Sequence, residues 1–248
     1  MFNPYSLDGK TILITGASSG IGKTTAIECS KLGAQVVITG RDRNRLQETY
    51  DLLEGAGHLM IAADLTAAEE VEALLTELPQ LSGVVNNAGI ALPKLFSFTT
   101  NEEAEQVFKT NFFSPFELLR GIVKRKKLVK NSSVVFVSSI AGTTITSLGG
   151  SVYGASKSAL NGLSKALALE LAPKRIRVNT VMPGMIETQI LADSSIGEAD
   201  LEADRKRYPL GRYGQPQDVA YAIIYLLSDA SSWMTGTNLL LDGGYTLT

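Results

Sequence analysis

Tyr153 and Lys157 lie four positions apart at the start of an Ala- and Leu-rich run that is typical of a helix. Residues at i and i+4 share one helix face, so the phenol and the ammonium can point into the same site. Lowering the pKa of a phenol from about 10 to about 7 requires roughly 4 kcal/mol. A lysine ammonium ~4 Å away supplies about that much at an effective dielectric constant of ~20. The pair therefore predicts a tyrosine that acts as a general acid or base, although a half-buried tyrosine beside a solvated lysine has the same spacing.

A glycine-rich turn near the start of the chain is the second candidate element. Segment 15–22, Thr-Gly-Ala-Ser-Ser-Gly-Ile-Gly, follows an apolar run and opens a helical stretch. Glycines let the backbone approach a pyrophosphate, and the unpaired N–H groups of a helix N-terminus favour negative charge. The spacing differs from the common G-x-G-x-x-G pattern, and strand-to-helix turns also use glycine for steric reasons alone. Its position at the first strand–helix junction favours a dinucleotide site.

Composition limits the class of protein. The chain has 248 residues, 44% of them hydrophobic, which predicts one domain with a substantial core. A net charge of −2 gives no reason to expect a nucleic acid or an anionic membrane as partner. With one cysteine, Cys29, no intrachain disulfide can form, so we expect a reducing, cytoplasmic compartment. Neither a signal peptide nor a membrane span is expected, and the lone His58 predicts neither a metal site nor serine–histidine hydrolysis.

The positions of strands and helices follow from alternating apolar and amphipathic runs. We expect strands at 11–15, 35–39, 58–62, 83–86, 133–138, 177–180 and 238–241. We expect helices at 21–32, 43–53, 67–78, 102–127, 152–171 and 217–228. This alternation predicts an α/β fold, a doubly wound parallel sheet of Rossmann type with about seven strands and helices on both faces. Ligands of such sheets bind beyond the carboxyl ends of the strands, which brings together Gly16, Asp64, Asn86, Ser139 and Tyr153.

With these residues assembled, the chain resembles the short-chain dehydrogenase/reductase family from about Asp8 to Gly244. The matching residues are the turn 15–22, Asp64-Leu65, segment 86–89, Asn111, Ser138-Ser139, Tyr153, Lys157, Pro183-Gly184 and segment 241–244. The resemblance implies hydride transfer between a nicotinamide and a carbonyl or secondary alcohol. It implies the catalytic residues Asn111, Ser139, Tyr153 and Lys157. It implies cofactor contacts from Gly16, Ser18, Ser19, Gly20, Ile21, Gly22, Arg41, Asp64, Leu65, Asn87, Ala88, Gly89, Tyr153, Lys157, Pro183, Gly184, Ile186 and Thr188.

The family also implies what each catalytic group does. Tyr153 would protonate the nascent alkoxide, and Lys157 would lower the tyrosine pKa and bind the nicotinamide ribose. Asn111 would kink the helix 102–127 and hold a water in a proton relay. Ser139 matches the serine that holds the substrate oxygen when the alignment follows Ile140-Ala141-Gly142. Its interval to Tyr153 is one residue longer than the family's most frequent spacing, so Ser138 stays open as the alternative.

Cofactor choice depends on the residues after the second strand. NAD-preferring relatives usually have a carboxylate at the position of Gly40, whereas here Arg41 follows that glycine. The planar fork of an arginine suits a 2′-phosphate, and Arg43 can assist. Asp42 adds a negative charge nearby, and Ser19 is not the basic residue that some NADP enzymes have in the glycine turn. We expect NADP(H) to be favoured over NAD(H).

The substrate is less well determined. The resemblance is closest to 3-oxoacyl-(acyl-carrier-protein) reductases, which implies a 3-oxoacyl thioester of fatty acid synthesis, carried on acyl carrier protein. A sugar, polyol, steroid or other hydroxy-compound dehydrogenase is the alternative, and a non-catalytic NADP-binding sensor or scaffold is a third hypothesis. We expect substrate contacts from segments 91–96 and 143–150 and from a lid at about 185–212 that contains Ser194 and Ser195.

Partners of this protein follow partly from charge and partly from resemblance. A basic group made of 124–127, Lys130 and Lys174-Arg175 can attract an acidic carrier protein if it surrounds the entrance, or can simply stay solvated. The resemblance implies a homotetramer formed through the helices 102–127 and 152–171 and the C-terminal strand.

Overall fold

Seven parallel strands form the centre of the fold. The computed structural model describes residues 3–188 and 197–247. The strand order is β3-β2-β1-β4-β5-β6-β7, and every neighbouring pair is parallel. The bounds are β1 Thr11–Thr15, β2 Gln35–Gly40, β3 Leu59–Ala62, β4 Leu81–Asn86, β5 Leu128–Val137, β6 Arg177–Pro183 and β7 Asn238–Leu241. The prediction of a doubly wound parallel sheet is confirmed, and the order of the strands reverses between β1 and β4.

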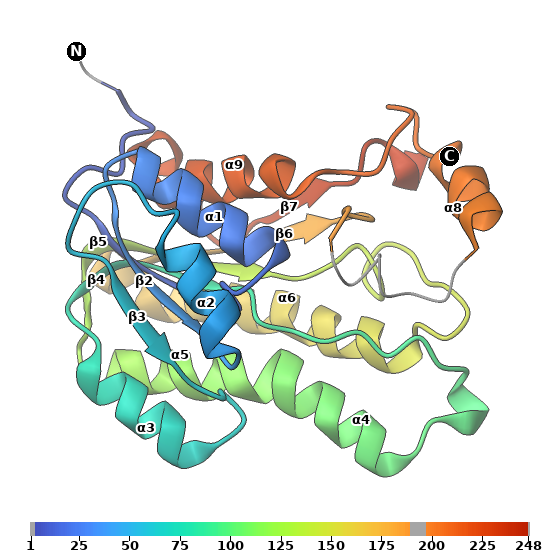
Figure 1. The fold of residues 1–248 in the computed structure, drawn as a ribbon, viewed down its shortest axis with the longest axis horizontal. Coiled ribbons are helices and arrows are strands. Elements are labelled where there is room, and N and C mark those ends of the chain that lie inside the picture. Colours follow the sequence, from blue (N-terminus) through green and yellow to red (C-terminus); the bar gives the residue numbers. More distant parts are fainter. Residues whose placement is uncertain (1–2, 189–196, 248) are drawn as a thin grey trace.

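Helices cover both faces of this sheet (Figure 1). The helices in the described residues are α1 Gly20–Lys31, α2 Arg43–Tyr50, α3 Ala68–Glu77, α4 Asn101–Phe108, α5 Ser114–Lys124, α6 Ser151–Leu171, α8 Glu198–Arg205 and α9 Pro216–Leu227. Of these, α8 lies near the C-terminus rather than over the sheet (Figure 1). One core joins the sheet to α1, α2 and α9, and the other joins it to α3, α5 and α6. Because side chains alternate along a strand, Ile12 and Ile14 enter the first core and Leu13 enters the second.

Polar side chains define where several helices begin. The Asp42 carboxylate accepts hydrogen bonds from the backbone N–H groups of Asn44 (3.0 Å) and Arg45 (3.1 Å), which caps α2. Thr100 and Glu103 form a reciprocal capping box at the start of α4. The first residue of α9 is Pro216, a position where its missing N–H costs no helical hydrogen bond.

The long helix predicted over 102–127 is interrupted at Asn111, as the resemblance implied, but it ends earlier than predicted. It is divided into α4 and α5 by a π-helical turn, Lys109–Phe113, which contains Asn111. The helix also ends at Lys124, because Lys126 adopts a left-handed φ of 53° and the chain reverses. The following strand β5 begins at Leu128, which pairs with Leu81, five residues before the predicted start at 133.

The predicted lid at about 185–212 is only partly described. Residues 189–196, with Ser194 and Ser195, lie outside the described residues. The described part contains the helix α8, which was not among the predicted helices. Among the residues that the structure describes, none of the helices combines the length and the apolarity that crossing a membrane requires.

Candidate active site

The glycine turn and the segment after β4 are joined at the point where the strand order reverses. The Thr15 hydroxyl accepts hydrogen bonds from the backbone N–H groups of Asn87 and Ala88, both at 3.0 Å. In return, the Asn87 amide nitrogen donates to the carbonyl oxygens of Thr15 (3.0 Å) and Gly16 (3.2 Å). This reciprocal network fixes the two loops against each other. Thr15 was part of the matched turn 15–22, but this contact was not predicted, because a strand-end threonine carries no distinctive pattern.

Three glycines in the turn occupy positions where a side chain would clash or be strained. Gly16 has a φ of 64°, and a Cβ there would lie 2.9 Å from the Ala88 Cα. A Cβ on Gly22 would collide with the Gly16 carbonyl oxygen and the Asn87 side chain. Gly20 has a φ of 53° and faces Thr188, whose Cγ2 would be 3.2 Å from a Cβ. The bare backbone at the N-terminus of α1 therefore fits the pyrophosphate of a dinucleotide, with Thr188 at its side.

The end of β2 has room and positive charge beside this turn. A Cβ on Gly40 would lie 3.5 Å from the Ser18 hydroxyl and 3.6 Å from Leu46 Cδ1, which are ordinary contact distances. Arg41 is exposed, and the neighbouring Asp42 carboxylate is occupied in capping α2. The negative charge of Asp42, noted in the sequence, is therefore bound to the N-terminus of α2.

Asp64 follows β3 and lies within reach of the same positive charge. Burial raises the pKa of the Asp64 carboxyl, but hydrogen bonds from Thr66 and the charges of Arg41 and Lys109 outweigh it, so this pKa is lowered. Both the backbone N–H and the hydroxyl of Thr66 donate to Asp64 Oδ1 at 2.8 Å. Asp64 is therefore a fixed, ionised carboxylate near Arg41, and the adjacent Leu65 side chain is buried.

Lys157, Asn111 and Gly89 meet at the carboxyl end of β4. A Cβ on Gly89 would lie 3.1 Å from the Lys157 Nζ and 3.2 Å from the Asn111 Oδ1. The Asn111 Oδ1 accepts the Ile90 N–H at 2.8 Å, and its Nδ2 donates to the Ile90 carbonyl at 2.9 Å and to the Ser156 hydroxyl at 3.0 Å. The π-helical turn thus brings Asn111 between the segment after β4 and the helix α6. No sequence pattern indicated Ser156, whose role depends on this contact.

The structure distinguishes the two candidate serines. The Ser138 hydroxyl donates to the Lys157 backbone carbonyl at 2.8 Å, which occupies it within α6 packing. The Ser139 hydroxyl accepts the Ala141 N–H at 3.1 Å and forms a hydrogen bond with the Tyr153 phenol. Ser139 rather than Ser138 therefore adjoins the tyrosine.

The electrostatics of Tyr153 differ from the sequence-based expectation. Burial raises the pKa of the Tyr153 phenol, and the hydrogen bond with Ser139 offsets only part of this rise. The buried Lys157 ammonium donates to the Val137 carbonyl at 2.9 Å, and burial lowers the pKa of Lys157 to about 8. The expected lowering of the tyrosine pKa by Lys157 is therefore wrong for this structure. Desolvation dominates for both groups, of which Lys157 is buried and Tyr153 is half-buried.

The remaining predicted contacts lie at the ends of β6 and β1. Pro183 ends β6 and accepts the Ile140 N–H at 3.1 Å, and the Gly184 N–H donates to the Leu241 carbonyl at 2.9 Å. The Ile186 side chain is buried, and Thr188 lies against Gly20. Ser18, Ser19 and Ile21 are half-buried in the glycine turn. The structure thus brings the sequence-predicted residues to one edge of the sheet.

The basic group does not surround this edge. Lys124 ends α5, Lys130 lies near the start of β5, and Lys174-Arg175 precede β6, so all are at the amino ends of the strands. Arg125 pairs with Glu72, and the Lys127 ammonium donates to the Leu78 carbonyl. The hypothesis that these cations border the entrance is therefore wrong. Their positions at the end of α5 and near the beginnings of strands, with local partners for Arg125 and Lys127, account for them instead.

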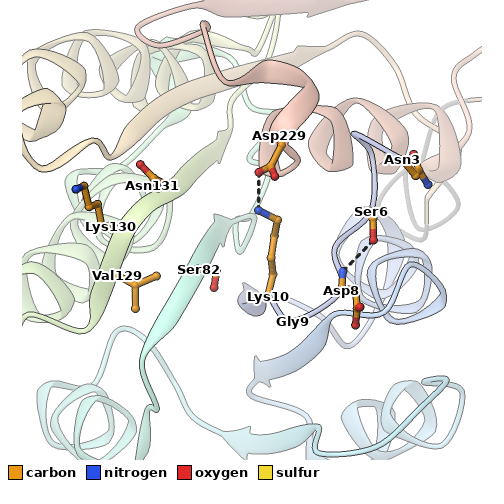
Figure 2. A pocket seen from close by; sticks show the side chains of 10 residues that line it. All are labelled: Asn3, Ser6, Asp8, Gly9, Lys10, Ser82, Val129, Lys130, Asn131 and Asp229. Carbon is orange, nitrogen blue, oxygen red and sulfur yellow. Dashed lines mark hydrogen bonds and ion pairs between the residues drawn. The ribbon is translucent and has the colours of Figure 1, made fainter. Parts of the chain in front are cut away.

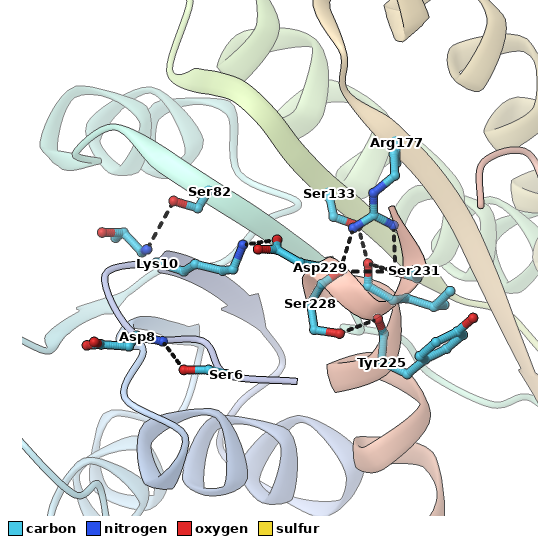
Figure 3. Close-up of polar contacts among 12 residues, drawn as sticks. Ser6, Asp8, Lys10, Ser82, Ser133, Arg177, Tyr225, Ser228, Asp229 and Ser231 are labelled. Carbon is cyan, nitrogen blue, oxygen red and sulfur yellow. Dashed lines mark hydrogen bonds and ion pairs between the residues drawn. The ribbon is translucent and has the colours of Figure 1, made fainter. Parts of the chain in front are cut away.

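An open polar pocket of about 420 Å³ lies at that opposite edge and includes Lys10, Ser82 and Lys130 (Figure 2). None of the predicted site residues lines it. Its Lys10 ammonium pairs with Asp229 at 2.8 Å. Nearby, the Arg177 guanidinium donates to the Ser231 hydroxyl (2.8 Å) and the Ser228 carbonyl (3.1 Å), as Figure 3 shows. These contacts fasten the end of α9 to the sheet, so this edge is structural.

Comparison with known proteins identifies the family. A family model described as enoyl-(acyl carrier protein) reductase matches residues 16–246. A 3-oxoacyl-(acyl-carrier-protein) reductase of Rickettsia bellii is 35% identical over 238 residues, which are 96% of this chain and 97% of that protein. The chain belongs to the short-chain dehydrogenase/reductase family. As a short-chain dehydrogenase/reductase it is an oxidoreductase of a family that uses a nicotinamide cofactor.

Other members of the short-chain dehydrogenase/reductase family are similar over almost the whole chain. A tropinone reductase homolog of Arabidopsis thaliana is 34% identical over 247 residues, with 97% of this chain and 91% of that protein covered. A dehydrogenase/reductase of Sinorhizobium meliloti, known as a crystal structure, has a TM-score of 0.88 and 33% identity, covering 98% of this chain and 97% of that one. The family resemblance found in the motifs is thereby confirmed.

Proposed function

We propose that this protein is an NADP(H)-dependent reductase that converts the keto group of a 3-oxoacyl thioester into a hydroxyl group. The observation that carries the proposal is the hydrogen bond between Ser139 and Tyr153, on the helix α6 that also carries Lys157. Such a pair of hydroxyl groups can hold and protonate one carbonyl oxygen. The acyl thioester is favoured because similar proteins are named 3-oxoacyl-(acyl-carrier-protein) reductases.

Each side chain has a defined task in this proposal. The nicotinamide cofactor supplies a hydride to the carbonyl carbon when it is bound. The Ser139 hydroxyl donates a hydrogen bond to the carbonyl oxygen, and this bond strengthens as negative charge develops there. The Tyr153 phenol, whose pKa is raised by burial, is protonated at neutral pH and donates its proton to the same oxygen. A raised pKa keeps the phenol in its protonated form, which is the form that reduction of a carbonyl requires.

Lys157 and Asn111 support these two hydroxyl groups. The Lys157 ammonium is held by the Val137 carbonyl near Gly89, where it would meet the ribose of the nicotinamide. Asn111 fixes Ile90 and, through Ser156, the helix that carries Tyr153. Both therefore keep the cofactor and the phenol in one geometry.

The preference for NADP(H) rests on the end of β2. Gly40 has no side chain to oppose a 2′-phosphate, and Arg41 supplies a guanidinium next to it. The neighbouring Asp42 carboxylate is engaged by the α2 backbone, so it does not bind the ribose hydroxyls as an NAD-specific carboxylate would.

Further parts of the proposal concern the whole protein. We infer a single-domain subunit that assembles into a homotetramer in the cytoplasm and takes its acyl group from acyl carrier protein. Light scattering of the purified protein tests the assembly. A shift of the elution volume in the presence of acylated carrier protein tests that partner.

A substrate panel tests the reaction. Purified protein is mixed with NADPH or NADH and a 3-oxoacyl thioester, a 2-enoyl thioester, a steroid ketone or a keto sugar, and the loss of reduced cofactor is followed. We expect the highest kcat/KM with NADPH and the 3-oxoacyl thioester. A higher value for the enoyl thioester, as the family-model description suggests, or for a sugar or steroid, would replace the proposed substrate. No turnover with any carbonyl would favour the sensor or scaffold hypothesis.

A further inference from the structure

Lys94 lies in the segment between β4 and α4 and forms an ion pair with Glu103. Its ammonium is 2.7 Å from Glu103 Oε1 and 2.8 Å from Oε2, so the contact involves both carboxylate oxygens. The side chains are 35% and 32% exposed, which leaves the pair half-buried. Neither residue belongs to the catalytic set, and the two lie nine positions apart across an irregular segment.

Glu103 is itself fixed in position. It is the third residue of α4, where its Oε2 accepts the Thr100 N–H at 2.9 Å and its own N–H donates to the Thr100 hydroxyl at 3.3 Å. The hydrogen bond from Lys94 lowers the pKa of the Glu103 carboxyl, which therefore stays ionised. Lys94 is thus anchored to the beginning of a helix rather than to a mobile side chain.

The backbone of Lys94 makes a second connection. Its N–H donates to the Gly149 carbonyl at 3.1 Å, and a Cβ on Gly149 would lie 3.1 Å from the same nitrogen. Gly149 has a φ of 77° and is followed by Gly150, the N-cap of α6, whose first turn carries Tyr153. One residue therefore joins α4, the segment after β4 and the loop that begins the tyrosine helix.

The other end of the same segment is held independently. Ile90 is bound through both its N–H and its carbonyl by Asn111. Segment 90–94 is consequently fixed at both ends: the Asn111 side chain binds Ile90, and an ion pair with Glu103 holds Lys94. Exposed apolar residues adjoin the second anchor in sequence, since Leu95 is 48% and Leu148 is 94% exposed.

We propose that Lys94 is a positioning residue: its contacts with Glu103 and Gly149 hold segments 91–98 and 143–150 together. These contacts would set the gap between the two segments, which we call the substrate mouth. This inference rests on the proposed function, because the segments expected to contact the substrate are 91–96 and 143–150. Lys94 does not touch the reacting atoms. Its loss should weaken substrate binding and leave the proton transfer by Tyr153 unchanged.

Two substitutions remove the ion pair while keeping the side-chain size. Lys94→Met deletes the ammonium, and Glu103→Gln deletes the negative charge but keeps an oxygen for the Thr100 N–H. Glu28→Gln is the matched control, because Glu28 pairs with Lys31 at 2.9 Å on α1, away from the mouth. Half-exposed ion pairs are modest, so each mouth variant should raise KM for the 3-oxoacyl thioester by about 2- to 5-fold.

The pattern of kinetic constants decides the outcome. We expect kcat and the KM for NADPH to stay near wild-type values in Lys94→Met and Glu103→Gln, with all constants unchanged in Glu28→Gln. The double variant should be no weaker than either single variant, because both remove one shared interaction. The proposal would be overturned if both single variants kept the wild-type KM for the 3-oxoacyl thioester. It would also be overturned if the increases in KM were additive in the double variant, or if the single variants changed kcat alone.

Hydrogen–deuterium exchange tests this clamp, the contacts of Lys94 with Glu103 and Gly149, without any substrate. The amides of 91–98 and 143–150 should exchange faster in Lys94→Met and Glu103→Gln than in wild type and Glu28→Gln. If the wild type reduces no 3-oxoacyl thioester, the proposed function fails, while faster exchange in both segments would still support the clamp. Exchange that is unchanged in both segments would overturn it.

Discussion

Arg41→Ala should weaken the preference of this protein for NADPH over NADH. Arg41 is exposed at the end of β2, and the two carboxylates near it are held elsewhere, Asp42 by the α2 backbone and Asp64 by Thr66. A charge-assisted hydrogen bond from a guanidinium to a phosphate contributes about 1.5–3 kcal/mol. Because Arg41 is exposed, we take the lower end, about 1.5 kcal/mol, which corresponds to roughly a tenfold change in binding.

The expected result is a KM for NADPH about tenfold higher than wild type, with the KM for NADH unchanged, because NADH has no 2′-phosphate. Gly40→Asp, added to Arg41→Ala, should weaken NADPH further by repulsion. The new side chain fits, since a Cβ at Gly40 meets its nearest neighbours at 3.5 and 3.6 Å. Steady-state kinetics with both reduced cofactors at a fixed substrate concentration measure these changes.

The control for this experiment is Arg45→Ala, which removes an exposed arginine from α2. It should leave both KM values unchanged. Added salt should weaken NADPH binding to wild type more than to Arg41→Ala, because the interaction is screened. Equal KM values for NADPH in wild type and Arg41→Ala, or a parallel loss of NADH binding, would refute the assignment of Arg41 to the 2′-phosphate.

Two further predictions concern the buried lysine and the glycines. Burial lowers the pKa of Lys157 from 10.5 to about 8, so the unfolded chain binds more protons between these pH values, and the free energy of unfolding should rise with pH across that window. Lys157→Met should remove about 3 kcal/mol of this rise, which urea denaturation of both proteins across the window would measure. Identical slopes of unfolding free energy against pH in the two proteins would contradict the burial of the charge. Gly22→Ala should lower the free energy of unfolding by about 1–3 kcal/mol and abolish tight cofactor binding, because its Cβ meets the Gly16 carbonyl. Gly162→Ala on α6, where a Cβ meets nothing within 4 Å, should instead raise the free energy of unfolding by about 0.5–1 kcal/mol; equal effects at the two glycines would refute the packing argument.

The sheet was predictable because its strands are short apolar runs between turns. The predicted bounds of β1 and β7 match the structure, and the others differ mainly at their ends. The beginning of β5 was not predictable, because Lys130 and Asn131 interrupt the apolar pattern and only the pairing of Leu128 with Leu81 makes this part a strand. The turn before it depends on a left-handed Lys126, a conformation that lysine rarely adopts.

The candidate site was predictable where spacing alone determines a shared face or edge. The i, i+4 spacing of Tyr153 and Lys157 and the strand-end position of Ser139 are of this kind. The pKa values were not predictable, since burial depends on how distant segments cover Tyr153 and Lys157. The ion pair of Lys94 and Glu103 was also missed, because two charges across an irregular segment have no fixed spacing.

The Tyr153→Phe variant tests the central claim, that the phenol beside Ser139 transfers the proton. Turnover of the 3-oxoacyl thioester with NADPH is measured together with NADPH binding by fluorescence titration. We predict a fall in kcat of at least about 100-fold and NADPH binding close to that of wild type, because only the acidic hydroxyl is removed. A kcat near that of wild type in this variant would contradict the account.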